Sequence, residues 1–208
     1  MTPRDRLRAA GFRTIRGVLA LRRPTAAANR HALGARSESL EAFTLRAADS
    51  GDIAALAALH VATWNDTYAP LMTGPPVAVR EQQWRQAFAD PGRWCCHVLA
   101  GPDGSLIGFA KGVIRPGHEI PGELNKLFLL RGYQRLGLGR RLLGRVVQWL
   151  LEADVAAMAA YVDPRNPSCG FFERTGAEWL REPTGAVNFS WYVWDDLGRL
   201  ARYCAPAT

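Results

Sequence analysis

One segment, residues 123–150, constrains the fold of this chain more than any other. Residues 123–130 read as a strand that ends in an apolar run and leads into a turn with glycines at positions 132, 137 and 139. After the turn, apolar residues recur at helical spacing and predict the clearest amphipathic helix in the chain: Leu138, Leu142, Leu143, Val146, Val147 and Leu150. A strand, a glycine-rich turn and a helix in this order are typical of a site where backbone amides bind an anion.

The chemistry of the turn favours a pyrophosphate. Glycine lets the backbone adopt positive φ, and the first amides of a helix have no partner within the helix. Gly132 and Gly137 match half of a P-loop, but Leu138 and Gly139 stand where that loop needs Lys and Ser/Thr. This excludes ATP or GTP hydrolysis of the usual kind. A dinucleotide fingerprint fits no better, because Leu142 replaces its third glycine and the preceding strand order is wrong.

Patterns elsewhere predict an α/β (α+β) sandwich around a mixed, mostly antiparallel sheet. We expect six to seven strands flanked by about four helices. Apolar or alternating runs predict strands at 43–46, 95–100, 105–114, 123–130, 155–162, 178–183 and 187–194. Helical spacing predicts helices at 53–64, 77–89 and 138–150, and a short one that ends near 174.

Two motifs carry a resemblance to a known family. Residues Gln134 to Gly139 read Gln-Arg-Leu-Gly-Leu-Gly and meet the pattern Gln/Arg-x-x-Gly-x-Gly/Ala in full. Asn166 to Ala177 follow with Asn-Pro-Ser-Cys-Gly-Phe-Phe-Glu-Arg-Thr-Gly-Ala. In these motifs, and over about residues 43–195, the chain resembles the GNAT superfamily of N-acetyltransferases. That resemblance implies acetyl-CoA as acyl donor, its pyrophosphate held in the turn, and no metal.

The resemblance also implies where the donor binds. In the family, two parallel neighbouring strands splay apart and the pantetheine inserts between them; here these would be 123–130 and 155–162. The splay leaves backbone donors free to bond the cofactor, and one of them could face the thioester oxygen. The cofactor-binding residues implied are Leu127, Phe128, Leu129, Gln134, Arg135, Leu136, Gly137, Leu138, Gly139, Arg140, Asn166, Cys169 and Phe172.

Glu123 is the general base that the resemblance implies. An alkylammonium has a pKa of about 10.4, so acetyl transfer near neutral pH needs a base. Family members with a glutamate base, which often acts through a water, carry it at this strand position. His118 and Glu119 in the preceding loop are the reserve candidates. Trp64 and Tyr68 occupy the region that faces the acceptor, which is a small-molecule or protein primary amine.

The chain departs from the family at its general acid. Many members have a tyrosine that protonates the departing thiolate, and this chain has Phe172 in its place. The general acid is therefore unassigned, with Tyr133 and Tyr161 as possible substitutes. Cys169 has no local histidine to activate it and is read as a small packing residue. The departure keeps an alternative open: a GNAT-like module that binds acyl-CoA without turnover.

The basic charge is concentrated at the N-terminus. Residues 1–42 hold nine arginines and only three acidic residues, so most of the net charge of +7 lies there. We expect a poorly ordered extension over 1–42 and an acetyltransferase domain over 43–204. Leu7, Phe12, Ile15 and Leu19 could line one side of a basic helix that Pro24 would stop. Only this arm is a candidate for binding nucleic acid.

The composition of the chain limits which cellular compartment and which kinds of metal site we expect. No run of 18 apolar residues occurs, so no membrane-spanning helix is expected. The four cysteines lack CxxC spacing, which argues against structural zinc and suits free thiols in the cytoplasm. A homodimer is a further possibility, because the C-terminal strands often build dimers in similar proteins.

Overall fold

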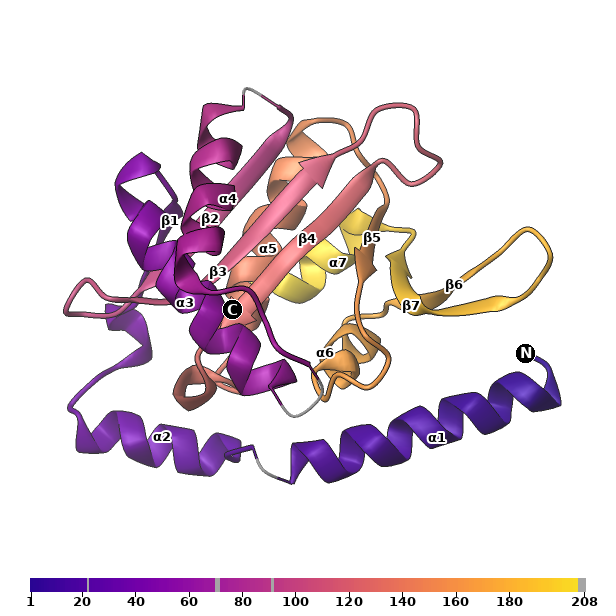
Figure 1. Ribbon diagram of the computed structural model, residues 1–208, viewed down its shortest axis with the longest axis horizontal. Helices are drawn as coiled ribbons and strands as arrows, with labels where there is room; N and C mark the ends of the chain where they lie inside the picture. The colour runs from indigo at the N-terminus through magenta and orange to yellow at the C-terminus, as the bar shows by residue number, and fades with distance from the viewer. Residues whose placement is uncertain (22, 70–71, 91, 206–208) are drawn as a thin grey trace.

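The centre of the molecule is a seven-stranded sheet. The computed structural model describes residues 1–21, 23–69, 72–90 and 92–205, and the strand order in them is β1-β2-β3-β4-β5-β7-β6 (Figure 1). Every neighbouring pair is antiparallel except β4 and β5, which run parallel. The expected mixed, mostly antiparallel sheet is confirmed. The strands are β1 Thr44–Ala47, β2 Trp94–Ala100, β3 Leu106–Ile114, β4 Gly122–Leu129, β5 Met158–Tyr161, β6 Glu178–Arg181 and β7 Val187–Trp194.

Helices cover both faces of the sheet. On one face lie α3 (Ile53–Tyr68) and α4 (Val77–Ala89), and on the other lie α5 (Leu138–Glu152) and α7 (Leu197–Cys204) (Figure 1). The short α6 (Cys169–Arg174) follows β5, and α1 (Pro3–Ala20) and α2 (Ala26–Ala35) precede the sheet. These seven α-helices in the described residues exceed the expected four by α1, α2 and α7. None of the described helices has the length and apolar character needed to cross a bilayer.

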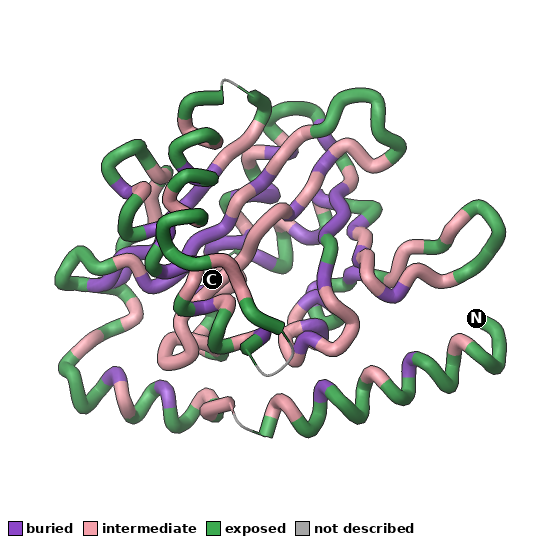
Figure 2. The backbone as a smooth tube through the Cα atoms, viewed as in Figure 1, coloured by how far each residue is buried: buried purple, intermediate pink, exposed green. Residues whose placement is uncertain are grey.

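Two apolar clusters hold the layers together, one on each face. The apolar stripe of α5 predicted from the sequence is buried to the last residue, with exposures of 0–1%, and packs against β3 and β4 in the larger cluster. In the smaller cluster, Leu56 of α3 and Trp84 of α4 pack against Phe109 and Val98 of the sheet. Figure 2 shows this distribution, with buried residues along the central strands and mostly exposed residues along α1 and α2.

The parallel contact between β4 and β5 is short. Only Gly122 and Glu123 of β4 pair with β5. Just beyond them Asn125 is an extra residue, because Leu124 and Lys126 pair with consecutive residues of β3. Such a β-bulge bends its strand and increases the local twist. The strands therefore diverge after Glu123, at the place where the resemblance implied a splay.

Residues 1–42 differ from our expectation of a poorly ordered extension. They form α1 and α2, which run along the edge of the domain (Figure 1). The side chain of Arg16 is 8% exposed and forms an ion pair with Glu173, with Nη1 and Oε1 2.7 Å apart. Its Nε also donates to the carbonyl oxygen of Pro164 at 2.6 Å. These partners lie far along the chain, so a local pattern of Arg and Ala does not reveal them.

The docking of α1 predicts a measurable contribution of Arg16 to stability. Arg16→Met leaves the Pro164 carbonyl without its side-chain donor and removes the ion pair of Glu173, which keeps the hydrogen bond from Tyr192, so we expect the free energy of unfolding to fall by about 1–3 kcal/mol. Urea denaturation of both proteins measures the change. Arg4→Met, at an exposed position of the same helix, is the control and should change stability by less than about 0.5 kcal/mol. Equal small effects of the two substitutions would show that α1 is not docked in solution.

Candidate active site

The turn between β4 and α5 has the backbone shape of an anion-binding nest. Arg135 and Gly137 have φ of 62° and 85°, so left-handed residues lie on both sides of Leu136. Within the described residues, the amides of residues 135–139 have no hydrogen-bond acceptor, and the first engaged amide is that of Arg140, 3.0 Å from the Gly137 oxygen. Free amides at a helix N-terminus are the donor set that a pyrophosphate requires. The turn therefore fits the diphosphate of acetyl-CoA.

The side chains of Gln134 and Leu138 support the turn, whereas that of Arg135 is exposed. Gln134 donates from Nε2 to the carbonyl oxygen of Leu129 at 2.9 Å, which ties the turn to the end of β4. Leu138 is 1% exposed and belongs to the larger apolar cluster. Phe128 packs on the opposite face, with its ring centroid 5.1 Å from that of His60. Gln134, Leu138 and Phe128 therefore offer mainly backbone groups to a cofactor.

The edge of β4 that faces β5 lacks a strand partner beyond Glu123. The predicted residues Leu127, Phe128 and Leu129 lie on this splayed segment and pair only with β3. Backbone groups on the other edge of such a strand have to find a partner in water or in a ligand. The segment connects Glu123 at one end with the nest at the other.

A hydrogen bond between Asn166 and Tyr68 connects the second cofactor motif with the end of α3. Asn166 is 8% exposed, and its Nδ2 donates to the Tyr68 hydroxyl at 2.7 Å. Because Asn166 donates to this oxygen, the hydroxyl proton of Tyr68 remains available for another acceptor. Burial raises the pKa of Tyr68 to about 12, so the hydroxyl is neutral near pH 7. The sequence suggested Tyr68 only as an acceptor contact, whereas the structure places it against the second cofactor motif.

Cys169 and Phe172 are packed into the interior. Cys169 is 0% exposed, and burial raises the pKa of its thiol to about 11. A thiol with that pKa is protonated near neutral pH and is a poor nucleophile. Phe172 is 7% exposed and packs its ring 5.7 Å from those of Tyr192 and Trp194. The arrangement favours a packing role for both side chains.

The arm bonds to both cofactor motifs. Arg23, which lies between α1 and α2, donates from Nη1 to Ser168 Oγ at 2.8 Å and lies 3.4 Å from Gln134 Oε1. The buried Asn29 of α2 donates to the carbonyl oxygens of Arg131 and Gln134 at 3.0 and 2.8 Å. These contacts hold the pyrophosphate turn and the start of α6 to a common support that the sequence did not predict.

Glu123 stands where β4 leaves β5, and its side chain is 12% exposed. It forms an ion pair with Arg115, and Asn125 Nδ2 donates to its Oε1 at 2.6 Å. Burial alone would raise the pKa of Glu123, but the hydrogen bonds from Arg115 and Asn125 outweigh it and lower the pKa. Glu123 is therefore a carboxylate at neutral pH.

The other predicted acid–base residues lie apart from this carboxylate. His118 and Glu119 are exposed in the loop between β3 and β4. Tyr161 is 66% exposed at the end of β5. Tyr133 packs edge-on against Phe43, with ring centroids 5.5 Å apart. None of the four forms a hydrogen bond to Glu123 in the described structure.

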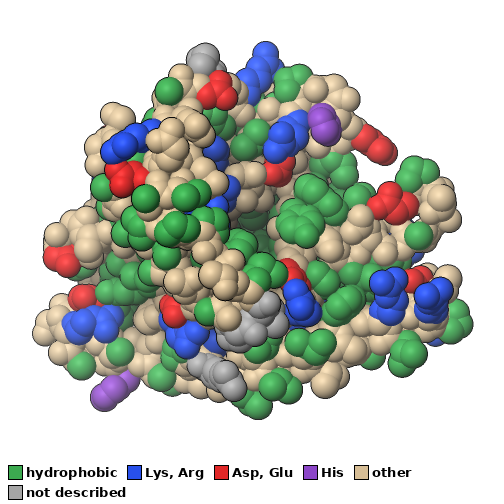
Figure 3. Space-filling model, viewed as in Figure 1, with side chains coloured by type: hydrophobic (Ala, Val, Ile, Leu, Met, Phe, Trp, Pro, Cys, Tyr) green, Lys and Arg blue, Asp and Glu red, His purple; other side chains and the backbone are tan. Residues whose placement is uncertain are grey.

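Sequence reasoning missed the basic residues beside Glu123. Lys111 of β3 and Lys126 of β4 face α3 and α4, and Arg80 of α4 stacks on Trp64, with its guanidinium carbon 5.3 Å from the ring centroid. In the sequence, the presence of a lysine within each of two central strands was the one feature that could have indicated this basic cluster. Figure 3 shows that this face of the molecule is hollowed beside α3 and α4, with basic and acidic side chains at the edge of the hollow.

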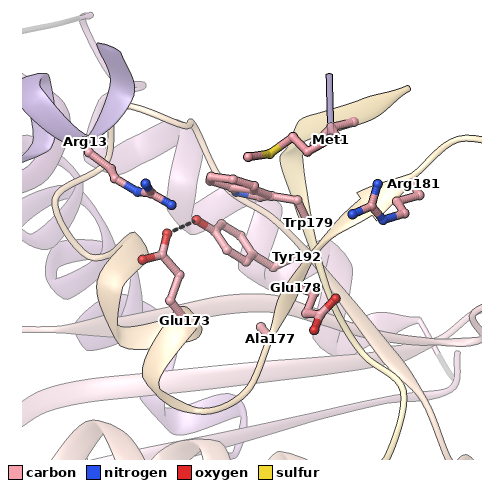
Figure 4. A pocket seen from close by; sticks show the side chains of 9 residues that line it. Met1, Arg13, Glu173, Ala177, Glu178, Trp179, Arg181 and Tyr192 are labelled. Carbon is pink, nitrogen blue, oxygen red and sulfur yellow. Dashed lines mark hydrogen bonds between the residues drawn. The ribbon is translucent and has the colours of Figure 1, made fainter. Parts of the chain in front are cut away.

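A second concavity lies away from these residues. An open pocket of about 310 Å³ lies between α1 and the β6–β7 hairpin and is lined by Arg13, Trp179 and Arg181 among others. Figure 4 shows Arg13 directed toward Glu173, which accepts a hydrogen bond from Tyr192 at 2.9 Å. None of the residues predicted to bind the donor lines this pocket, which belongs to the contact between the arm and the domain.

Comparisons with known proteins agree with this geometry. The model of the acetyltransferase (GNAT) family matches residues 53–177. The uncharacterised N-acetyltransferase YuaI of Bacillus subtilis is 33% identical over 147 residues, which cover 67% of this chain and 82% of that protein. Aminoglycoside N(6')-acetyltransferase type 1 of Stenotrophomonas maltophilia is 28% identical over 153 residues, covering 67% of this chain and 93% of that protein.

A solved structure shares the fold. The PaiA N-acetyltransferase from Thermoplasma acidophilum, in complex with coenzyme A, superposes with a TM-score of 0.59 at 16% identity and covers 73% of this chain and 97% of that one. At this identity the likeness concerns the fold. The enzyme class and the acyl donor that the sequence predicted, an N-acetyltransferase that uses acetyl-CoA, are confirmed, because the chain belongs to the acetyltransferase (GNAT) family.

Proposed function

We propose that this enzyme transfers the acetyl group of acetyl-CoA directly to a primary amine while both substrates are bound. One observation carries the proposal: the splayed segment of β4 lies between an ionised carboxylate, Glu123, and a turn with five free amides at residues 135–139. A single strand thus presents a base at one end and an anion site at the other. The domain that does this extends over residues 43–204.

Backbone groups would bind and orient the donor. The free amides of residues 135–139 would hold the pyrophosphate, and the unpaired edge at Leu127 to Leu129 would hydrogen-bond the pantetheine arm. One amide of this edge would face the thioester oxygen and stabilise the negative charge that develops there. In other acyl-transfer enzymes such a donor contributes about 3 kcal/mol to the transition state.

Glu123 would accept the proton of the attacking amine. Its lowered pKa keeps it ionised but makes it a weak base, so a water between the carboxylate and the amine is the route that fits. An amine acceptor agrees with the name of the Stenotrophomonas relative, which acetylates an aminoglycoside. The alternative is a module that binds acyl-CoA without turnover, which Phe172 favours by lacking the hydroxyl of the usual general acid.

The role of the turn predicts a loss of coenzyme A affinity in Gly137→Ala. At φ of 85° a side chain costs about 1–2 kcal/mol, and relief of that strain displaces the free amides. We expect coenzyme A to bind about tenfold more weakly by calorimetry. Gly104→Ala is the matched control, since Gly104 has φ of 80° and equally open surroundings in the β2–β3 hairpin. No heat when coenzyme A is titrated into the unaltered protein would refute donor binding at the turn.

The role of Glu123 predicts a loss of rate without a loss of donor affinity. Glu123→Gln removes the proton acceptor but keeps the size of the side chain, so kcat should fall by about 10²–10⁴-fold. The Kd for coenzyme A should stay the same by calorimetry. Glu152→Gln, at an exposed position at the end of α5, should change neither value. An unchanged kcat in Glu123→Gln would remove Glu123 from the mechanism.

The ion pair with Arg115 predicts the pH dependence. Because Arg115 lowers the pKa of Glu123, the carboxylate stays ionised to a lower pH than an ordinary glutamate. The stability it contributes is present above its unfolded pKa and is lost as the pH falls through the lower folded value. Arg115→Gln should therefore move the acid limb of the kcat/KM profile to higher pH, whereas Arg93→Gln should leave it in place. A profile unmoved by Arg115→Gln would show that another group controls it.

A further inference from the structure

The sheet face beneath α3 and α4 carries more positive charge than its fold requires. Lys111 of β3 and Lys126 of β4 are directly opposite each other in the ladder. Like charges at opposed positions destabilise a sheet. Arg80 of α4 adds a third cation on this face. A fold that needed only packing here would have apolar side chains in these places, so the three cations call for a functional explanation.

The charges are close enough to act on one another. Burial lowers the pKa of Lys126 to about 8, and Lys111 and Arg80 contribute to the decrease. Burial also lowers the pKa of Lys111. The negative charges that act on this cluster come from Glu123, for both lysines, and from Asp90, for Lys111. Glu123 is already engaged by Arg115 and Asn125. The cluster therefore retains an excess of positive charge.

Aromatic rings contact two of these cations, Lys111 and Arg80. Lys111 Nζ lies 4.8 Å from the ring centroid of Trp94 and 5.6 Å from that of Trp84. Trp84 in turn packs near His60, with ring centroids 6.2 Å apart. Cation–π contacts hold an ammonium in place without consuming its hydrogen-bond donors. The cations are thus positioned while some of their donors remain available.

Buried polar atoms in the same place have no partner. Trp84 Nε1, Arg80 Nε and His60 Nδ1 are inaccessible to water and make no hydrogen bond within the described structure. Trp84 and His60 are only 3% and 2% exposed. Buried polar atoms without a hydrogen-bond partner are rare in folded proteins and destabilise them. Trp84 Nε1 and Arg80 Nε can only donate, so the partner they lack is an acceptor, and the three cations beside them favour one with negative charge.

We propose that Arg80, Lys111 and Lys126 form an anion subsite that binds a carboxylate or phosphate group of the acceptor amine. The inference rests on the proposed function and narrows it to amines that carry an anionic group. Lys126 Nζ donates to Asn125 Oδ1 at 2.8 Å, and Asn125 Nδ2 donates to Glu123 at 2.6 Å. The anion subsite is thus linked to the proposed base, whereas a polycationic amine would be repelled there.

Matched acceptors test the charge preference. Phenylalanine and phenethylamine differ by one carboxylate, phosphoethanolamine and ethanolamine differ by one phosphate, and spermidine represents polycations. With acetyl-CoA at low salt, thiol release should give a kcat/KM about tenfold or more higher for the anionic member of at least one pair. The pair that shows it identifies the anion as carboxylate or phosphate. A preference for the neutral members or for spermidine would overturn the inference and leave the proposed function intact.

Binding resolves the case in which no pair is turned over. Calorimetry of the same compounds against the enzyme saturated with coenzyme A should show the anionic members binding more tightly. Equal or absent binding of all of them would overturn the anion subsite. Failure of coenzyme A itself to bind is a separate result, which would refute the proposed function.

Substitutions locate the preference in the anion subsite. Arg80→Gln and Lys111→Gln should each raise the KM for the preferred anionic acceptor about tenfold. The kcat/KM for its neutral partner should stay within about twofold, and coenzyme A affinity should be unchanged, which excludes misfolding. Arg85→Gln is the matched control, because Arg85 lies on the exposed side of α4 in an ion pair with Glu81. An equal loss with anionic and neutral acceptors would overturn the assignment.

Discussion

The divergence of β4 from β5 is the constraint on which the rest of the structure depends. Gly122 permits a close approach of β4 to the residue before β5, since a Cβ there would lie 2.6 Å from the carbonyl oxygen of Ala157. The bulge at Asn125 then turns β4 away. A strand that leaves its neighbour inside a sheet carries unpaired backbone groups, which are costly unless a ligand or water binds them. The donor site follows from this one interruption of the ladder.

The arm extends the site beyond the segment that matches the family. Residues 1–42 lie outside the matched region 53–177, yet Asn29 bonds to the turn before α5 and Arg16 bonds to the loop and helix after β5. Both of these side chains are buried. The two cofactor motifs follow β4 and β5, which diverge. The arm forms hydrogen bonds to both motifs and so connects them. Its arginines act here as hydrogen-bond donors to the domain.

Electrostatics gives the two ends of the site different roles. At the turn, amides and a helix N-terminus provide partial positive charge, to which the side chains of Arg135 and Arg140 add full charges. Beside Glu123, the charges are full and partly buried, and burial is what shifts the pKa of Lys126 and Lys111. Arg115 and Asn125 hold the carboxylate ionised among these cations. In the function that we propose, the acyl donor and the acceptor would thus be recognised by different physical means.

The sequence by itself determined the seven strands, the helices α3 to α6 and the backbone of the turn. Each of these depends on near neighbours: alternation, helical spacing, and glycine at a position such as Gly137 that needs positive φ. Only the tertiary structure decided that Arg115 engages Glu123, that Tyr68 meets Asn166 and that the arm is folded. The contacts of Tyr68 and of the arm join residues that are distant in the chain, Arg115 and Glu123 meet across the loop between β3 and β4, and the pKa shifts depend on burial. The spacing of residues along a sequence encodes neither these tertiary contacts nor the burial of the titrating groups.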